Sequence, residues 1–230
     1  MQQSARPAPR RGSGGYGKGD DTRARLVDEA LLIFGTRGYT AATTRELAAA
    51  AGVTLPSVTY YFGGKEGLYI ACAEAIVERF QHATAAAVGE ATATLGGGLE
   101  ADSARGHLKA IFRGLVSVFT GPRMDRDASF TREVLSSAGP AFDLLYGQLW
   151  QPGIELCAML IEQASHGELT GTVARTRAIM MISSLVGFSS GREVLRRAIG
   201  PDALSDAVRA EVTAVLDEQI DRIGERPCSR

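Results

Sequence analysis

The chain has 230 residues, of which 45% are hydrophobic and 22% are charged, close to the composition of an ordinary globular protein. This length is enough for one small domain and a larger domain with its own core. The formal net charge of −1 argues against a protein that coats nucleic acid indiscriminately, but it is compatible with a local basic site.

Residues 1–20 form a Pro-, Gly- and Arg-rich segment that we expect to be a disordered basic arm. The segment contains a formal G-x-G-x-x-G pattern, but no β-strand precedes it, so we expect no nucleotide site there. The segment contains one acidic residue, Asp20, and four basic residues: Arg6, Arg10, Arg11 and Lys18. The arm could therefore contact phosphates or a minor groove, or remain a solvated tail.

A first helix is predicted from about Asp21 to Arg37, with Gly38 as its stop. Apolar residues recur in it at three- and four-residue spacing, which predicts one buried face: Leu26, Ala30, Ile33 and Phe34. A helix buried in this way would support the elements that follow it.

Two short helices joined by a tight turn are predicted in residues 43–68, TTRELAAAAGVTLPSVTYYFGGKEGL. Thr43 and Glu46 have the spacing of a capping box, which marks the start of the first of them. Gly52 offers the left-handed conformation that ends this helix. Pro56 falls in the first turn of the second helix, where its missing N–H costs nothing. A helix, a turn containing glycine and a second helix present that second helix to the major groove of DNA.

The stretch TTRELAAAAGVTLPSVTYYFGGKEGLY resembles the DNA-binding domain of the TetR family of bacterial transcriptional repressors. The resemblance continues back through TRARLVDEALLIFGTRGYTAAT and so covers about residues 22–70. More weakly, TREVLSSAGPAFDLLYGQLWQPGIELCAMLIEQ and VGFSSGREVLRR are similar to a subgroup of ligand-responsive repressors in that family. The resemblance implies a helix-turn-helix DNA-binding domain at residues 21–70 and a regulatory and dimerisation domain at residues 83–225.

A fourth helix begins at Lys65 and is expected to continue to about residue 82. Its apolar residues again recur at helical spacing: Leu68, Tyr69, Cys72, Ile76 and Phe80. The helix leaves the DNA-binding unit, so it would be the physical connection between DNA and the part of the protein that controls it. From about Thr84 to Ser103 the sequence is rich in Ala, Thr and Gly, and its GGGLE segment is expected to break any helix.

The remaining sequence shows helical patterns and no sustained alternating strand pattern, which predicts an all-α C-terminal bundle. The helices are expected at residues 107–119, 126–137, 140–165, 173–199 and 205–223. Gly-Pro pairs separate several of them. Pro152, inside an otherwise helical stretch, predicts a kink that could make room for a ligand.

The family resemblance assigns DNA contacts position by position. Arg45 matches the residue of the first short helix that reaches a base edge. Leu55, Pro56 and Ser57 occupy the base-facing start of the recognition helix, the second of the pair. Contacts to the DNA backbone are implied for five further residues: Thr44, Thr59, Tyr60, Tyr61 and Lys65. We also expect Thr43 to belong to the DNA-binding site.

This sequence departs from the family pattern at four positions. Thr59 and Tyr61 stand where many members have Tyr and His, and a hydroxyl can still bind phosphate at both. Leu55 cannot hydrogen-bond a base, so it should favour contact with a thymine methyl group. Gly64 stands where Ser or Asn usually caps the fourth helix, which should weaken that cap by about a few tenths of a kcal/mol. Alternative roles are a solvated charge for Arg45, core packing for the tyrosines and an acidic partner for Lys65.

A ligand cavity is expected inside the C-terminal bundle, because ligand pockets are mostly apolar with a few polar groups. Eight residues are candidates for its lining, with ordinary core packing as the alternative for each: His107, Phe112, Phe119, Phe130, Arg132, Tyr146, Trp150 and Met180.

The last two long helices are the expected dimer interface. Residues 173–199 carry small side chains, including Ser183, Ser184 and Gly187, that permit close helix approach. The last helix carries an apolar stripe of Val208, Val212, Val215, Leu216 and Ile220. These helices would form a four-helix interface around a two-fold axis, unless the stripes complete the core of the monomer.

Three cysteines, Cys72, Cys157 and Cys228, have no metal-ligand spacing and are expected to be free thiols. We recognise no signal peptide and no stretch of membrane-spanning length, so we expect a cytoplasmic protein. The residues show no catalytic motif. The predicted function is a homodimeric transcriptional repressor that binds a palindromic operator without a cofactor and is released by a small-molecule effector. An activator or a ligand-independent DNA-binding protein of the same fold is the alternative.

Overall fold

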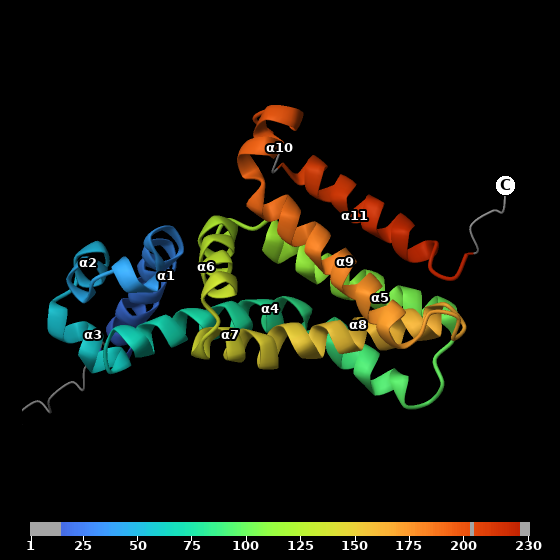
Figure 1. Ribbon diagram of the computed structural model, residues 1–230, viewed down its shortest axis with the longest axis horizontal. Helices are drawn as coiled ribbons and strands as arrows, with labels where there is room; N and C mark the ends of the chain where they lie inside the picture. The colour runs from blue at the N-terminus through green and yellow to red at the C-terminus, as the bar shows by residue number, and fades with distance from the viewer. Residues whose placement is uncertain (1–14, 203–204, 226–230) are drawn as a thin grey trace, which may run out of the picture.

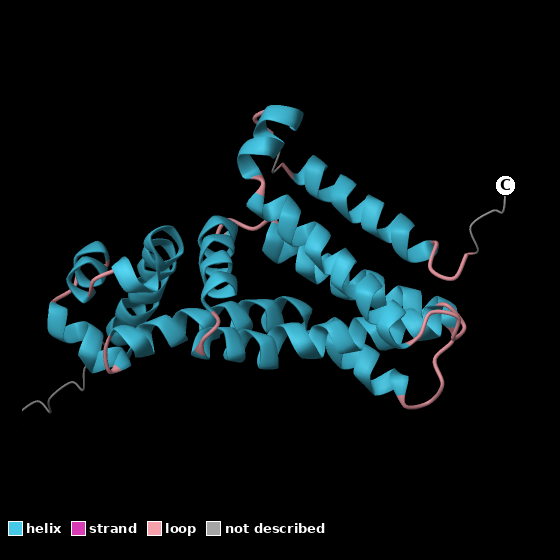
Figure 2. Cartoon of the chain, viewed as in Figure 1, coloured by secondary structure: helices cyan, strands magenta, loops and turns pink. Residues whose placement is uncertain are grey.

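The computed structural model describes residues 15–202 and 205–225, and every regular element in these ranges is a helix (Figures 1 and 2). The all-α fold predicted from the sequence is confirmed. The elements, in chain order, are α1 (Gly15–Ala41), α2 (Thr44–Ala50), α3 (Leu55–Phe62), α4 (Lys65–Leu95), α5 (Ala101–Phe119), α6 (Met124–Ser137), α7 (Pro140–Leu145), η1 (Tyr146–Trp150), α8 (Gln151–Ala164), α9 (Gly171–Ser190), α10 (Arg192–Ile199) and α11 (Asp206–Asp221). No helix in the described ranges combines the length and apolar character needed to cross a membrane.

Helix α1 begins at Gly15, six residues before the predicted start at Asp21. The expectation of a disordered arm is therefore wrong for residues 15–20, because a helix that is already nucleated gains one hydrogen bond for each residue added. The rest of the arm, with Arg6, Arg10 and Arg11, lies outside the described residues. The predicted stop at Gly38 is confirmed, since this residue has the non-helical angles φ 78° and ψ 160°.

Helix α4 runs to Leu95, so the predicted end near residue 82 is wrong. Its second half is rich in alanine, the strongest helix former, and Ala91 is fully buried. The helix ends only at the glycines that follow Leu95, where Gly98 takes a positive φ of 80°. Helix α5 then begins at Ala101, six residues before its predicted start.

The buried apolar side chains form two clusters. The head cluster, named here for its position in α1–α4 and extended by α6 and α7, includes Leu26, Phe34, Leu47, Val58, Leu68 and Phe130. The bundle cluster joins α4, α5, α8, α9 and α11 and includes Leu108, Phe112, Leu160, Ile161, Leu216 and Ile220. Leu115 and Phe119 of α5 touch both. The helix pair α2–α3 therefore shares its core with α6, which packs along α1 (Figure 1).

A π-helical turn, η1, replaces regular α-helix directly before Pro152. The N–H of Gln151 bonds the carbonyl of Tyr146, five residues earlier. Pro152 cannot donate a backbone hydrogen bond, and its ring would clash with a carbonyl in the preceding turn, so the helix widens there. The predicted single helix over residues 140–165 is in this way divided into α7, η1 and α8 without an intervening loop.

The C-terminal helices also differ in part from their prediction. The helix expected over residues 173–199 is broken at Gly191 into α9 and α10. Helix α11 packs on α5, where Leu216 and Ile220 join the bundle cluster and Lys109 pairs with Asp221 at 2.7 Å. These two stripe residues therefore complete the monomer core.

Candidate nucleic-acid interface

The N-terminus of α2 is closed by the predicted capping box. The Glu46 N–H donates to the Thr43 hydroxyl oxygen at 3.3 Å, and the Thr43 N–H donates to the Glu46 carboxylate at 3.0 Å. The bonds from Thr43, reinforced by Arg37 of α1, hold the pKa of the Glu46 carboxyl below its usual range. The Thr43 hydroxyl itself donates to Glu46 at 2.9 Å, so its proton is engaged in capping rather than free for a phosphate.

Helix α3 buries one face and leaves the other in solvent. Val58 is fully buried in the head cluster, with Val53 and Phe62 partly buried beside it. On the opposite face, Tyr60 is 82% exposed and Leu55 is 46% exposed. Pro56 and Thr59 are also exposed. A face of this composition is a poor solvated surface and a suitable surface for a DNA groove.

Two members of the predicted set are less exposed than expected. Tyr61 is half-buried and packs against the head cluster, with its ring 5.0 Å from that of Tyr60. Ser57 is half-buried, and its hydroxyl lies 2.9 Å from that of Thr54. Each of these side chains is partly covered by the protein and partly in solvent. Helix α3 has only about two turns, so its side faces lie at the edge of the buried face.

Two cations of this region, Arg45 and Lys65, have no carboxylate partner in the part of the chain that the structure describes. Arg45 is exposed on α2, and Thr44 beside it is half-buried. Lys65, at the N-terminus of α4, donates to the Thr40 carbonyl at 3.5 Å and lies 4.3 Å from the centre of the Tyr39 ring. Within residues 15–202 and 205–225, no carboxylate lies within ion-pair distance of Arg45 or Lys65. Such uncompensated cations, at the end of the molecule formed by α2 and α3 (Figure 1), suit an anionic partner.

The turn from α3 into α4 depends on glycine. Gly63 and Gly64 take positive φ values of 73° and 135°, and Gly64 gives α4 no side-chain cap, as predicted. A Cβ atom on Gly67 would lie 1.8 Å from the Phe62 carbonyl oxygen. Only glycine allows α4 to cross the end of α3 this closely. Gly67 was not among the residues predicted from the sequence, because an isolated glycine in a helical pattern is tolerated and does not by itself reveal such a contact.

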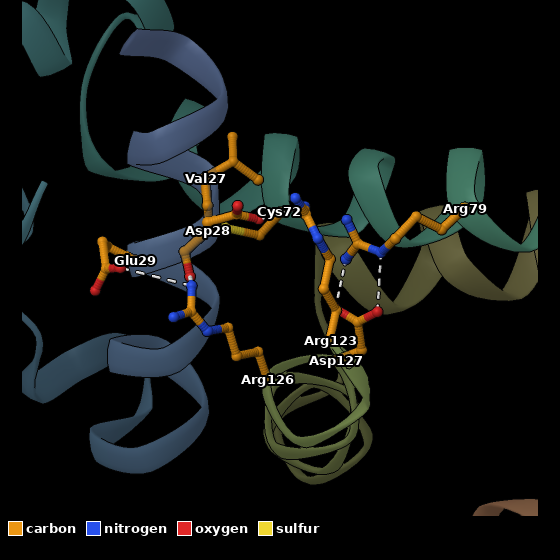
Figure 3. A network of polar contacts seen from close by, with 8 residues as sticks. All are labelled: Val27, Asp28, Glu29, Cys72, Arg79, Arg123, Arg126 and Asp127. Atoms are coloured by element: carbon orange, nitrogen blue, oxygen red, sulfur yellow. Dashed lines mark hydrogen bonds and ion pairs between the residues drawn. The ribbon is translucent and has the colours of Figure 1, made fainter. Parts of the chain in front are cut away.

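Ion pairs fix α6 against the helices that support this surface (Figure 3). Arg123, directly before α6, pairs with Asp28 of α1 at 2.7 Å, and Arg126 of α6 donates to the Asp28 carbonyl at 3.1 Å. Asp127 accepts two hydrogen bonds from Arg79 of α4, one of them from Nε at 2.9 Å. Burial raises the pKa of Asp127 above its ordinary value, and Arg79 opposes this rise.

The eight residues predicted to line a ligand cavity are not brought together. Phe130 lies in the head cluster and Phe112 in the bundle cluster, where both serve as ordinary core. Phe119 and Trp150 are half-buried, and the His107 ring nitrogen Nε2 lies 3.0 Å from the Thr94 hydroxyl. The other three are exposed: Arg132, Tyr146 and Met180. Aromatic identity predicts burial, but it does not predict which cluster receives the ring.

An open hollow of about 650 Å³ lies between the start of α5 and the end of α8, and none of the eight lines it. Its polar lining includes Glu100, Arg105, Glu162 and His166. Arg105 donates to the carbonyls of Ala164 and Ile223, so it ties α5 to the ends of α8 and α11.

The two described cysteines are buried free thiols. Burial raises the pKa of Cys157 to about 12 and shifts that of Cys72 in the same direction. Both thiols therefore stay protonated and unreactive at neutral pH. The third, Cys228, lies outside the described residues.

Residues 26–72 match the family model for bacterial regulatory proteins, tetR family. The N-terminal part of the chain is therefore a TetR-family DNA-binding domain. The match contains all of α2 and α3 and the N-terminus of α4 with Lys65.

A curated relative is similar to part of this chain. The HTH-type transcriptional dual regulator CecR of Shigella flexneri is 49% identical over 61 residues, which is 26% of this chain. The alignment spans 27% of CecR, so the chain matches only about a quarter of that relative's length.

Solved structures extend the likeness to the C-terminal helices. The fatty acid degradation regulator FadR of Bacillus halodurans has a TM-score of 0.57 at 17% identity, over 85% of this chain and 94% of FadR. AibR, solved with isovaleryl coenzyme A and operator DNA, has a TM-score of 0.58 at 16% identity, over 86% of this chain and 97% of AibR. At these identities the likeness shows a shared fold across both parts of the molecule.

Proposed function

We propose that this TetR-family regulator is a homodimeric repressor that binds a palindromic operator and is released from it by a small-molecule effector. The observation that carries the DNA-binding part is the outer face of α3. Tyr60 is left 82% exposed there, and on α2 Arg45 is exposed with no ion-pair partner among the described residues. The Tyr60 ring packs edge-on against Tyr61 but keeps most of its surface in solvent, where a DNA groove and its phosphates would contact it.

The proposed contacts divide into two kinds. Arg45 would read a base edge, since its guanidinium is free to bond a guanine in two places. Leu55, Pro56 and Ser57 would face bases at the start of the recognition helix. The backbone contacts would fix the register of the protein on DNA, and they include one cation at a helix N-terminus: Thr44, Thr59, Tyr60, Tyr61 and Lys65. Thr43 would act mainly by capping α2.

Exposed apolar side chains on the last helices support a dimer. A single helix-turn-helix buries too little surface for tight specific binding, and such modules usually act as symmetric pairs. Helices α9–α11 leave large apolar side chains in solvent: Val173, Ile179, Met180, Val194, Ile199 and Val215. The small residues Ser183, Ser184 and Gly187 of α9 are exposed as well. A second copy of the chain would cover this surface and place two recognition helices on successive major grooves.

Release by an effector is supported by proteins of the same fold. AibR was solved with both isovaleryl coenzyme A and operator DNA, and FadR is a regulator of fatty acid degradation. In this chain, the effector would favour a dimer whose two recognition helices no longer match the spacing of adjacent grooves. CecR is a dual regulator, and this favours activation at some promoters as a second candidate. A reporter gene behind the native promoter, with and without the protein, separates the two.

Fluorescence anisotropy on DNA from upstream of the protein's own gene tests the DNA-binding proposal. The titration is run at two salt concentrations with wild type, R45A and Y60A. R132A is the matched control, because Arg132 is exposed on α6, away from α3. We expect R45A to cost about 1–3 kcal/mol of binding free energy and R132A to leave binding unchanged.

Weak binding that ignores sequence and both substitutions on this DNA has two explanations. A genome-wide selection of bound fragments distinguishes them. Recovery of one motif bound through Arg45 places the operator elsewhere in the genome. Failure to enrich any motif contradicts the proposal.

A further inference from the structure

Glu133 of α6 holds two parts of the DNA-binding head at once. One carboxylate oxygen accepts the backbone N–H of Tyr39 at 3.0 Å, and the other accepts the hydroxyl proton of Tyr69. Tyr39 follows the break in α1 at Gly38, and Tyr69 lies in the second turn of α4. Glu133 therefore joins α6 to the corner before α2 and to the start of α4.

The Tyr39 ring in turn supports Lys65. The Lys65 ammonium lies 4.3 Å from the centre of this ring and donates to the carbonyl of the next residue, Thr40, at 3.5 Å. A cation over an aromatic face is attracted by the negative charge of the ring face. Because no described carboxylate pairs with Lys65, this platform is what orients its ammonium.

The contact between Glu133 and the tyrosines lies in a packed environment. Tyr69 is 8% exposed, and its ring lies 5.0 Å from the rings of both Phe34 and Phe130 and 4.8 Å from that of Tyr39. Burial, followed by the bond to Glu133, raises the pKa of Tyr69, so the hydroxyl remains a donor. A shift of α6 would have to move these rings or leave a buried hydroxyl without its acceptor.

We propose that Glu133 is a positioning residue for the DNA contact made by Lys65, acting through Tyr39. This proposal rests on the proposed DNA-binding function. Helix α6 holds the backbone of Tyr39, and Tyr39 holds the ammonium that binds a phosphate. Any effector that displaces α6 would thus change a phosphate contact inside each head as well as the distance between heads.

A double-mutant cycle in operator binding tests the proposal, with wild type, E133A, K65A and E133A/K65A measured by anisotropy at several salt concentrations. K65A should lower affinity and reduce the salt slope by about one phosphate contact. E133A should also lower the affinity and reduce the salt slope. In the K65A background, E133A should cause no more than about a twofold further loss, within the ordinary scatter of independent substitutions.

R123A is the matched control for general loosening of α6. It removes the ion pair with Asp28 of α1, which is separate from the Tyr39 contact, and leaves the bonds of Arg126 to Asp28 and Glu29 in place. Its effect on DNA binding should therefore add to that of K65A. E133Q should restore part of the loss, because the amide oxygen can still accept one of the two bonds. If thermal unfolding shows that E133A does not fold, E133Q and Y69F replace it, each measured alone and combined with K65A.

Equal losses from E133A in the wild-type and K65A backgrounds would overturn the proposal, as would a salt slope unchanged by K65A. Absence of sequence-specific binding by the wild-type protein would instead contradict the proposed function. The two failures are therefore distinguishable in one experiment.

Discussion

Arg79 of α4 and Asp127 of α6 form a bidentate pair, in which Arg79 Nε lies 2.9 Å from the carboxylate (Figure 3). The Asp127 residue is only 6% exposed, and the Arg79 side chain is 23% exposed. The pair lies where the long connecting helix meets the helix that packs along the DNA-binding head. Arg123, directly before α6, and Arg126 both bond Asp28 of α1, so the start of α6 is bound to both α1 and α4.

Replacing Arg79 with methionine should destabilise the protein by about 3 kcal/mol, because a carboxylate would be left buried without its partner. The double variant R79M/D127L should recover most of this loss, since an apolar pair needs no charge compensation. Urea unfolding at pH 7 measures both. R113M, which breaks the more exposed pair between Arg113 and Asp217, is the control and should cost less than about 1 kcal/mol. An R79M loss no larger than that of R113M would contradict the expectation.

The R79M loss should depend on pH. Burial already raises the pKa of Asp127, and Arg79 opposes the rise. Without Arg79 the folded-state pKa should rise further above the unfolded value of about 3.9. Folded protein then binds a proton that the unfolded chain releases, so the stability of the variant falls as pH rises between these two pKa values. The loss relative to wild type should therefore be smaller at pH 5 than at pH 8. A constant loss would show that Asp127 stays ionised.

The local signals in the sequence were sufficient for the DNA-binding head. The capping box at Thr43 and Glu46, the left-handed Gly52 and the early Pro56 act within a few residues, so their pattern is visible without tertiary structure. The extents of α1 and α4 were underestimated. Composition suggested a disordered tail before α1 and a linker after residue 82. Helix propagation instead extends α1 toward the N-terminus, and the burial of Ala91 extends α4 to Leu95.

The contacts that connect the head to the bundle could not be predicted in this way. Glu133 lies 94 residues from Tyr39 and 64 from Tyr69 in sequence, so no local pattern relates them. The ligand-pocket prediction depended on residue type and on position within the predicted C-terminal bundle. Phe112 and Phe130 meet these criteria equally well, yet they are buried in two different clusters.

Substituting Gly67 with alanine should impair both folding and DNA binding. The added Cβ would overlap the Phe62 carbonyl oxygen, and since this atom is backbone, α3 must move relative to α4. Gly89 is the matched control in the same helix, because a Cβ there meets nothing within 4 Å. G89A should stabilise the protein by up to about 1 kcal/mol through helix propensity. Thermal unfolding and operator binding of both variants check this, and a G67A protein that behaves like G89A would contradict it.

Introducing a charge on the exposed face of α9 should separate the proposed dimer. Met180 is 66% exposed in the monomer, so M180D should fold normally but place a carboxylate in a buried interface. Sedimentation should show a monomer, and operator affinity should fall, because one head cannot occupy both half-sites. L135D is the control, since Leu135 of α6 is 53% exposed outside α9–α11. A dimer that survives M180D but is lost in L135D would place the interface on α6 instead.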